Sequence, residues 1–144
     1  MFNGLLNKAE FAKLDFSALR LCFGGGSAVQ QAVAQKWQAV TGLPIIEGYG
    51  LSETSPVALV NPTNASEYSG DIGFPLPSTD IVVLGENDRE LPPGEAGELA
   101  IQGPQVMKGY WQRPEETAAS FTASGFFKTG DIAIMSAEGR VRII

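Results

Sequence analysis

Two clusters of polar residues, far apart in the chain, carry the side-chain types that a nucleotide needs. The first spans residues 49–54 (YGLSET) and the second spans residues 128–131 (KTGD). In the first, the Tyr49 ring offers a stacking face, the Ser52 hydroxyl can donate to a phosphate, and the Glu53 carboxylate is a hard oxygen ligand for Mg²⁺. In the second, Asp131 follows a Thr-Gly turn and can accept two hydroxyl donors, as a ribose diol presents them. Together the clusters predict a site for an adenine nucleotide.

Each cluster also has an interpretation without a ligand. Tyr49 can be a core residue that precedes an ordinary helix start, and Asp131 can be a turn carboxylate that satisfies its own backbone. Glu98 follows a glycine and can be either exposed or structural on its strand, whereas Tyr110 and Trp111 are interpreted as packing residues.

A glycine run at residues 24–26, followed by Ser27, lies between a predicted strand and a predicted helix start. Free amides and the helix dipole at such a junction favour ligand oxygens or ring nitrogens, although a steric turn is the alternative. No Gly-Lys-Ser/Thr follows, so the run is not a phosphate-binding P-loop. The spacing of the dinucleotide-binding motif also fails, at Val29.

Composition excludes several classes of function. The chain has 144 residues, a net charge of −6 and no histidine, so every His-based triad and every His-ligated metal site is excluded. Cys22 is the only cysteine, which rules out an intrachain disulfide and is compatible with a reducing cytoplasm. Basic residues are scattered singly, and nucleic-acid binding is therefore not expected.

The first half of the chain has the pattern of a βαβ unit. A short amphipathic helix is predicted near Phe2, followed by a buried strand at 19–23 and a helix that starts at a Ser27-x-x-Gln30 capping box. The buried stripe of that helix is predicted to comprise Val29, Val33, Trp37 and Val40, with Gly42 ending it. A second strand at 44–46 then leads into Tyr49. Strand, helix and strand within about thirty residues predict a parallel sheet, with Tyr49 at the carboxyl edge where such sheets bind ligands.

The second half reads as mostly β. The pattern changes near residues 72–77, and beyond this point short strands alternate with turns. Strands are predicted at 81–84, 91–95 and 98–102, a brief helix opens at Pro114, and a hairpin pairs 132–135 with 140–144. The fold class is therefore α/β followed by mostly β: a sheet subdomain over residues 1–75 and a small, barrel-like β-subdomain over residues 76–144.

Several of these segments resemble the adenylate-forming superfamily of acyl-CoA synthetases, luciferases and adenylation domains. The family's Tyr-Gly-x-Thr-Glu motif is similar to residues 49–53, its Gly-Glu-Leu stretch to 97–99 and its Thr-Gly-Asp to 129–131. Residues 104–111 and 125–131 resemble bacterial long-chain fatty-acid–CoA ligases in particular. The resemblance implies the end of the family's large domain: part of its sheet, followed by its β-barrel subdomain.

The resemblance implies a role for individual residues of the nucleotide site. Ser52 would contact the α-phosphate, Glu53 would bind Mg²⁺, and these two are the implied catalytic residues. Tyr49 would pack on the adenine and Asp131 would hold the ribose hydroxyls. The remaining nucleotide-binding residues would be Gly26, Ser27, Ala28, Glu47, Gly48 and Gly50, and the acyl chain would be near Gly24, Gly25 and Leu51. Ser52 stands where the family usually has Thr, and Ala28 where it frequently has Pro.

The implied reaction has two steps and needs ATP, Mg²⁺ and coenzyme A. A fatty-acid carboxylate attacks the α-phosphate of ATP to give acyl-AMP and pyrophosphate, and the coenzyme A thiol then displaces AMP. The family's upstream phosphate loop and its small C-terminal domain are not found in the sequence, and residues 143–144 end in an apolar strand. We therefore expect a fragment of a cytoplasmic enzyme that is inactive by itself, with peripheral contact of its parent at the inner membrane face.

Two other functions fit the residues. The chain can be a non-catalytic module that binds a nucleotide or a partner protein. It can also belong to an adenylate-forming enzyme for an aryl acid or an amino acid, since the sequence does not reveal the acyl preference.

Overall fold

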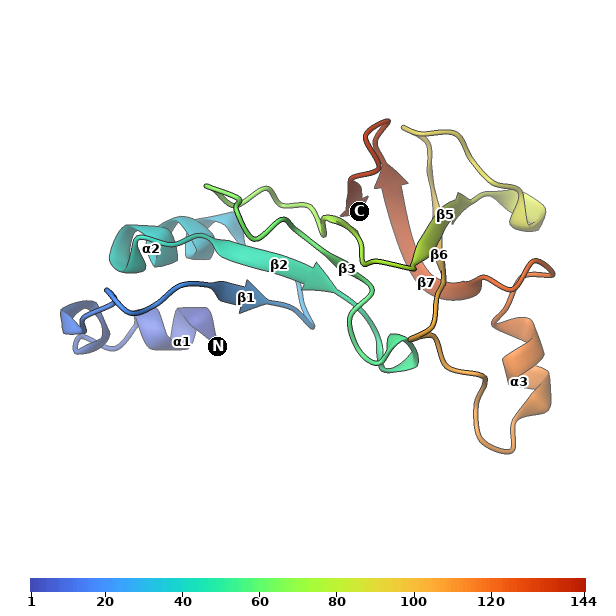
Figure 1. The fold of residues 1–144 in the computed structure, drawn as a ribbon, viewed down its shortest axis with the longest axis horizontal. Helices are drawn as coiled ribbons and strands as arrows, with labels where there is room; N and C mark the ends of the chain where they lie inside the picture. The colour runs from blue at the N-terminus through green and yellow to red at the C-terminus, as the bar shows by residue number, and fades with distance from the viewer.

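A computed structural model describes all 144 residues and contains two four-stranded sheets that follow one another along the long axis (Figure 1). The first sheet has the order β1-β2-β3-β4 and the second has the order β5-β6-β7-β8. The first half comprises α1 (Phe2–Leu6), a 3-10 turn (Phe11–Lys13), β1 (Cys22–Gly24), α2 (Gln31–Thr41), β2 (Ile45–Tyr49), a 3-10 turn (Ser52–Thr54), β3 (Leu59–Val60) and β4 (Phe74–Pro75). The second half comprises β5 (Asp80–Leu84), a 3-10 turn (Glu86–Asp88), β6 (Ala96–Gln102), α3 (Pro114–Ala119), β7 (Phe127–Met135) and β8 (Val141–Ile143).

The predicted βαβ unit is confirmed. Strand β1 pairs in parallel with β2, with Cys22 opposite Ile45, and α2 connects the two strands. Trp37 of α2 is 5% exposed and packs between the rings of Phe2 and Phe11. Helix α2 ends as expected at Gly42, whose φ of 76° lies in the left-handed region that favours glycine. The unit places the Tyr49 cluster at the carboxyl end of β2.

Two details of this unit differ from expectation. Helix α2 begins at Gln31, with the extended residue Gln30 as its N-cap, so the predicted Ser27 capping box is wrong. The Val29 amide donates to the carboxylate of Glu47 on β2 instead, and residues 25–30 remain a loop. Strand β1 is shorter than predicted, and Phe23 is 51% exposed rather than buried, because β1 is an edge strand of the sheet.

The face that α2 buries also differs from the predicted stripe. Trp37 is buried as expected, but Val29, Val33 and Val40 are only partly buried. The fully buried positions beside Trp37 are Ala34 and Thr41, and the Thr41 hydroxyl donates to the Trp37 carbonyl at 2.9 Å.

The second sheet is antiparallel throughout and contains the predicted hairpin of β7 and β8. Residues 91–95, predicted as a strand, form a connection, because two consecutive prolines lack the amide donors of a ladder. Asp131 lies within β7 and not on a turn. Residues 129–131 bulge opposite Leu99 of β6, and Gly130 has a φ of 78° there.

One hydrophobic core joins the two sheets. Ala58 and Leu59 of the first half pack with Leu99, Ile101, Ala133 and Val141 of the second, and all six side chains are 0% exposed. The architecture confirms the predicted fold class, an α/β segment followed by a curled, mostly antiparallel β segment. None of the helices has both the length and the apolar character required to cross a bilayer.

Candidate nucleotide-binding site

The chain makes a tight turn where β2 ends. A Cβ atom on Gly50 would overlap the carbonyl oxygen of Pro56, so only glycine permits this approach. The buried Thr54 hydroxyl accepts the Leu51 amide at 2.9 Å and donates to the Pro56 carbonyl at 2.8 Å. These contacts hold the short 3-10 turn on which Glu53 is carried.

The two polar clusters meet in the structure. The Tyr49 hydroxyl donates to Asp131 Oδ2 at 2.5 Å across 82 residues of sequence. The bulge in β7 orients Asp131, since its amide donates to the Thr129 hydroxyl, which in turn donates to the Leu99 carbonyl. Burial, together with the hydrogen bond to Asp131, raises the pKa of Tyr49 well above its usual value. Tyr49 therefore remains a neutral donor at physiological pH.

A cavity of about 300 Å³ opens beside this pair, which we call the central cavity. Its volume is at the lower end of the range for small-molecule pockets. It is lined by Gly26, Ser27, Ala28, Glu47, Gly48, Tyr49, Gly50, Leu51, Tyr68, Gly70, Ile72, Asp131 and Ile143. The structure thus gathers around one space every nucleotide-site residue that the sequence suggested, except Ser52 and Glu53.

The glycine loop that forms one wall of the central cavity is held at Val29. The Val29 amide donates to Glu47 Oε1 at 3.0 Å, and the Val29 carbonyl accepts the Tyr68 hydroxyl at 2.5 Å. Burial raises the pKa of Glu47, which is 7% exposed. Burial and the neighbouring Glu47 carboxylate raise the pKa of Tyr68 to about 12. Both residues anchor the loop by contacts to its backbone.

A second cavity of about 560 Å³, which we call the apolar cavity, shares Gly26, Gly48, Tyr49 and Gly50 with the central one. Its other lining residues are Phe23, Gly24, Gly25, Pro56, Val57, Val60, Thr63 and Leu76. No charged side chain lines it. Gly24 and Gly25 therefore lie where an apolar ligand could be held, whereas Leu51 lines the central cavity instead.

A third cavity of about 420 Å³, which we call the Glu53 cavity, shares Leu51 with the central cavity. Glu53 Oε1 accepts the Tyr110 hydroxyl at 2.9 Å, and this hydrogen bond raises the pKa of Tyr110. Glu98 also lines this cavity and accepts the Gly130 amide at 2.9 Å, so it supports the bulge that carries Asp131. Ser52 is exposed and lines none of these three cavities.

The donor set at Glu53 fits a magnesium ion that is held mainly by a substrate. No group of three or more Asp, Glu, His or Cys residues that could hold a metal occurs in the chain. Magnesium is usually bound through one or two carboxylates plus substrate phosphates and water. Two carboxylates line the polar Glu53 cavity, and because Glu98 already accepts the Gly130 amide, Glu53 is the one that suits that mode of binding.

Some lining residues were not anticipated. Tyr68 lies in a polar loop and Ile143 in an apolar strand, and neither has a local sequence signal that distinguishes it from an ordinary surface or core residue. The interpretation of Trp111 as a packing residue is wrong, since its side chain is 87% exposed. Tyr110 is half-buried and bonds to Glu53.

Comparison with known proteins identifies the family. The model of the family described as "AMP-binding enzyme" matches residues 1–111. The chain belongs to the AMP-binding enzyme family. This agrees with the resemblance to adenylate-forming enzymes, and the motifs at Tyr49 and Glu53 lie within the matched residues.

The relatives include enzymes that differ in substrate. A long-chain-fatty-acid–CoA ligase of Escherichia coli O6:H1 is 51% identical over all 144 residues, and the chain covers 26% of its length. A mitochondrial malonate–CoA ligase of Bos taurus is 35% identical over 136 residues, with 81% of the chain and 23% of that protein covered. The crystal structure of ATP-bound MatB from Rhodopseudomonas palustris superimposes with a TM-score of 0.88 at 33% identity, covering 99% of the chain and 28% of MatB. The chain thus spans about a quarter of the length of these relatives.

Proposed function

We propose that this chain is part of an acid–thiol ligase that activates a long-chain fatty acid with ATP and transfers it to coenzyme A. The observation that carries the proposal is the central cavity, where Tyr49 from the first sheet and Asp131 from the second meet beside the glycine loop. The identity of 51% with a long-chain-fatty-acid–CoA ligase over the whole chain supports the choice of reaction. We place the protein in the cytoplasm, with peripheral contact at the inner membrane face.

In this proposal the central cavity holds the AMP moiety. The adenine packs on Tyr49 against the loop of Gly26, Ser27 and Ala28, with Gly48 and Gly50 allowing close approach of the backbone. Asp131 accepts the ribose hydroxyls, for which its second carboxylate oxygen has no partner among the side chains of the protein. Glu47 holds the loop through the Val29 amide.

In this proposal the phosphates extend from the central cavity toward the Glu53 cavity, where their charge is neutralised. Glu53 would hold Mg²⁺, which neutralises phosphate charge when bound, and Ser52 would donate its hydroxyl to the α-phosphate. The attacking group is a carboxylate that is ionised at neutral pH, so no general base is required. Catalysis then depends on positioning and on charge stabilisation, which a chain without histidine can supply.

The apolar cavity favours an uncharged acyl chain as the substrate. A second carboxylate or an ammonium group would need a charged partner inside the protein, and no charged side chain lines this cavity. A hydrocarbon chain gains about 0.8 kcal/mol for each CH₂ group that it buries. This observation favours a fatty acid over a dicarboxylic acid or an amino acid.

The test is acid-dependent exchange of pyrophosphate into ATP by the complete protein that carries this chain. We expect exchange with long-chain fatty acids and its loss in Asp131→Ala. Asp80→Ala, which removes an exposed carboxylate outside the three cavities, should retain it. Exchange with another acid alone would correct the substrate, and no exchange from a folded protein would contradict the ligase function. Acyl-CoA formation by residues 1–144 alone would refute the view that they require the remainder of such an enzyme.

A further inference from the structure

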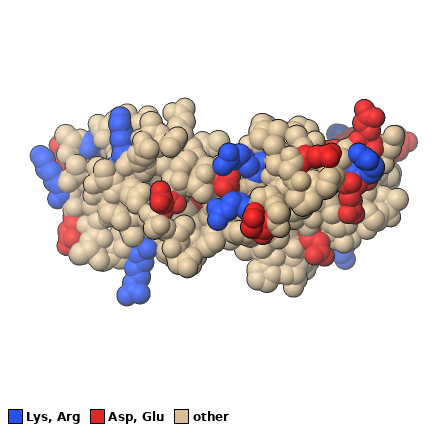
Figure 2. Space-filling model, turned by 90° about the horizontal axis from the view of Figure 1, so that it is seen from above, with Lys and Arg blue, Asp and Glu red and all other residues tan.

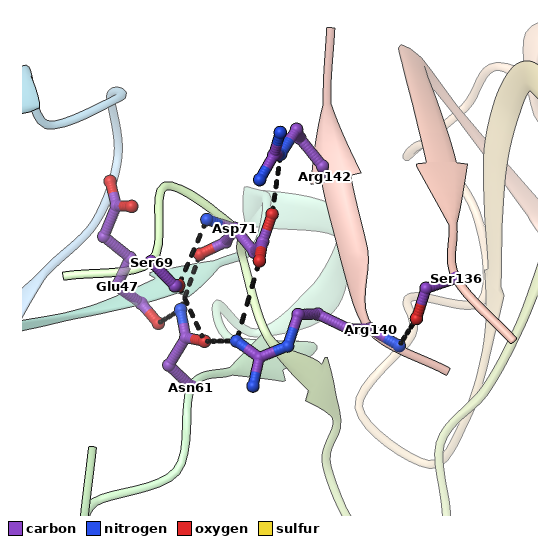
Figure 3. A network of polar contacts seen from close by, with 7 residues as sticks. All are labelled: Glu47, Asn61, Ser69, Asp71, Ser136, Arg140 and Arg142. Atoms are coloured by element: carbon purple, nitrogen blue, oxygen red, sulfur yellow. Dashed lines mark hydrogen bonds and ion pairs between the residues drawn. The ribbon is translucent and has the colours of Figure 1, made fainter. Parts of the chain in front are cut away.

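A polar cluster joins the two sheets beside the central cavity (Figure 3). Asp71, in the loop between β3 and β4, accepts a hydrogen bond from Arg142 Nε at 2.7 Å, and its other oxygen lies 3.6 Å from Arg140 Nη1. Arg140 Nη1 also donates to Asn61 Oδ1 at 3.1 Å. Arg140, which directly precedes β8, and Arg142 within β8 thus bind two residues of the first half. Figure 2 shows acidic and basic side chains adjacent near the middle of the long axis, where the two halves meet.

Backbone hydrogen bonds complete this connection, which we call the seam. The Ile72 amide donates to the Val141 carbonyl and the Val141 amide donates to the Gly73 carbonyl, both at 2.9 Å. Gly73 has a φ of 87°, and a Cβ atom there would overlap the Val60 carbonyl. The loop is therefore pressed against β3 on one side and against β8 on the other.

The seam fixes segments that line the central cavity, although its charged side chains do not line it. Tyr68, Gly70 and Ile72 of the loop and Ile143 of β8 all face the cavity, and Asp71 and Arg142 are the sequence neighbours of three of these four residues. The Asn61 side-chain amide donates to the Asp71 carbonyl at 2.5 Å, and the Asn61 main-chain amide donates to the Glu47 carbonyl at 2.9 Å. The seam thus reaches β2 as well.

We propose that Asp71 and Arg142 are positioning residues for nucleotide binding, because their ion pair sets the wall formed by Ile72 and Ile143. This proposal rests on the proposed function of the central cavity. The Asp71 side chain is 11% exposed and that of Arg142 is 59% exposed. Exposed ion pairs contribute little to stability. The shared core holds the sheets together, so losing this pair shifts the cavity wall without unfolding the protein.

The test compares Arg142→Met, Asp71→Asn and the double variant in the complete protein. We expect Arg142→Met to raise the Kd for AMP and the KM for ATP by roughly three- to tenfold, the range of a partly exposed charged contact. The kcat for exchange should stay within about twofold, since the reacting atoms are not touched. The Kd of the double variant for AMP should be no higher than that of the single variant that binds AMP more weakly. Both substitutions remove the same Asp71–Arg142 interaction, so their effects should not add.

A matched control is Glu116→Gln, which removes the 2.6 Å pair between α3 and its N-cap residue Arg113; neither residue lines any of the three cavities. It should leave Kd, KM and kcat unchanged. The proposal is overturned if Arg142→Met, with an unchanged melting temperature, binds AMP like the wild type, or if it lowers kcat at constant KM. Additive losses in the double variant would also overturn it.

Calorimetry measures AMP binding without turnover, so it tests the role of the seam independently of the proposed ligase function. A wild-type protein that binds AMP but exchanges pyrophosphate with no acid would contradict the ligase function, and the variants would still decide the role of the seam. A folded wild-type protein that binds neither AMP nor ATP would overturn both. If Asp71→Asn fails to fold, Arg142→Met, changed at the exposed end of the pair, gives the decisive measurement.

Discussion

At the scale of one residue, the buried carboxylate of Glu47 orders the glycine loop but lowers the stability of the fold at neutral pH. Its carboxylate is 7% exposed and accepts the Val29 amide, yet no cation pairs with it. Burial disfavours the charged form, which is why its pKa is raised. The residue orders the glycine loop at the expense of carrying a poorly solvated charge at neutral pH.

Replacing Glu47 by Gln should therefore stabilise the fold at neutral pH. The folded-state pKa of Glu47 lies above its ordinary value of 4.5, so its favourable contribution is complete below pH 4.5 and is lost as pH rises through the folded-state pKa. Gln keeps an acceptor for the Val29 amide without titrating. The gain of the variant should be absent near pH 4 and grow above pH 4.5, measured by denaturant unfolding across this range.

The control for this prediction is Glu67→Gln, which changes an exposed carboxylate in the loop after β3. It should leave the free energy of unfolding at pH 7 unchanged. A Glu47→Gln variant that is less stable than the wild type at pH 7 would show that the charge itself, and not only the acceptor, holds the loop.

At the scale of elements, the geometry of the site depends on how β2 ends and how β7 is interrupted. The turn after Tyr49 doubles back so closely that Gly50 contacts the Pro56 carbonyl. The bulge in β7 turns Asp131 toward β2, whereas a regular ladder would have continued the alternation of faces. Each irregularity interrupts a regular pattern at a residue that lines the central cavity.

Gly50→Ala should destabilise the protein by about 2 kcal/mol or more, because the added methyl group would overlap main-chain atoms that cannot move independently. Gly4→Ala is the matched control. No atom lies within 4 Å of a Cβ at that position in α1, so the change should be neutral or slightly stabilising. Thermal unfolding of both variants checks this, and equal melting temperatures would contradict the close approach at Gly50.

At the scale of the whole molecule, the two sheets behave as one unit because their cores are continuous. Leu59 of β3 packs with Leu99 and Ile101 of β6, and the seam adds polar contacts beside them. Tyr49 and Asp131 belong to different sheets, so their 2.5 Å contact requires this fixed arrangement. A nucleotide bound between Tyr49 and Asp131 would contact both halves of the protein.

Leu59→Ala should lower the stability of both sheets together by about 2–5 kcal/mol, since it removes a large side chain that is 0% exposed. Fluorescence of Trp37 reports on the first half when the exposed Trp111 is replaced by Phe. Hydrogen exchange of β7 amides reports on the second. Both probes should shift by the same free energy, and a change confined to one sheet would show that the halves unfold separately.

Local sequence patterns were sufficient to predict the elements that are determined by residues close to one another in the chain. The presence of α2, the glycine that ends it, the parallel pairing of β1 with β2 and the β7–β8 hairpin were all predicted correctly, because each depends on residues that are close in the chain. The start of α2 and the strand at 91–95 were not. The Val29 amide donates to Glu47 of β2 and not to a capping hydroxyl, and the prolines at 92 and 93 lack the amide donors of a strand.

The sequence by itself determined the family, the fold class and most residues of the central cavity, since motifs such as YGLSE and TGD keep their chemical types side by side. Only the tertiary structure decided which of them meet. Asp131 reaches Tyr49 through a bulge that needs a partner strand, and Tyr68, Ile72 and Ile143 join the cavity through packing between sheets. Asp71 and Arg142 had no motif at all, because an ion pair between residues 71 positions apart exists only once the chain is folded.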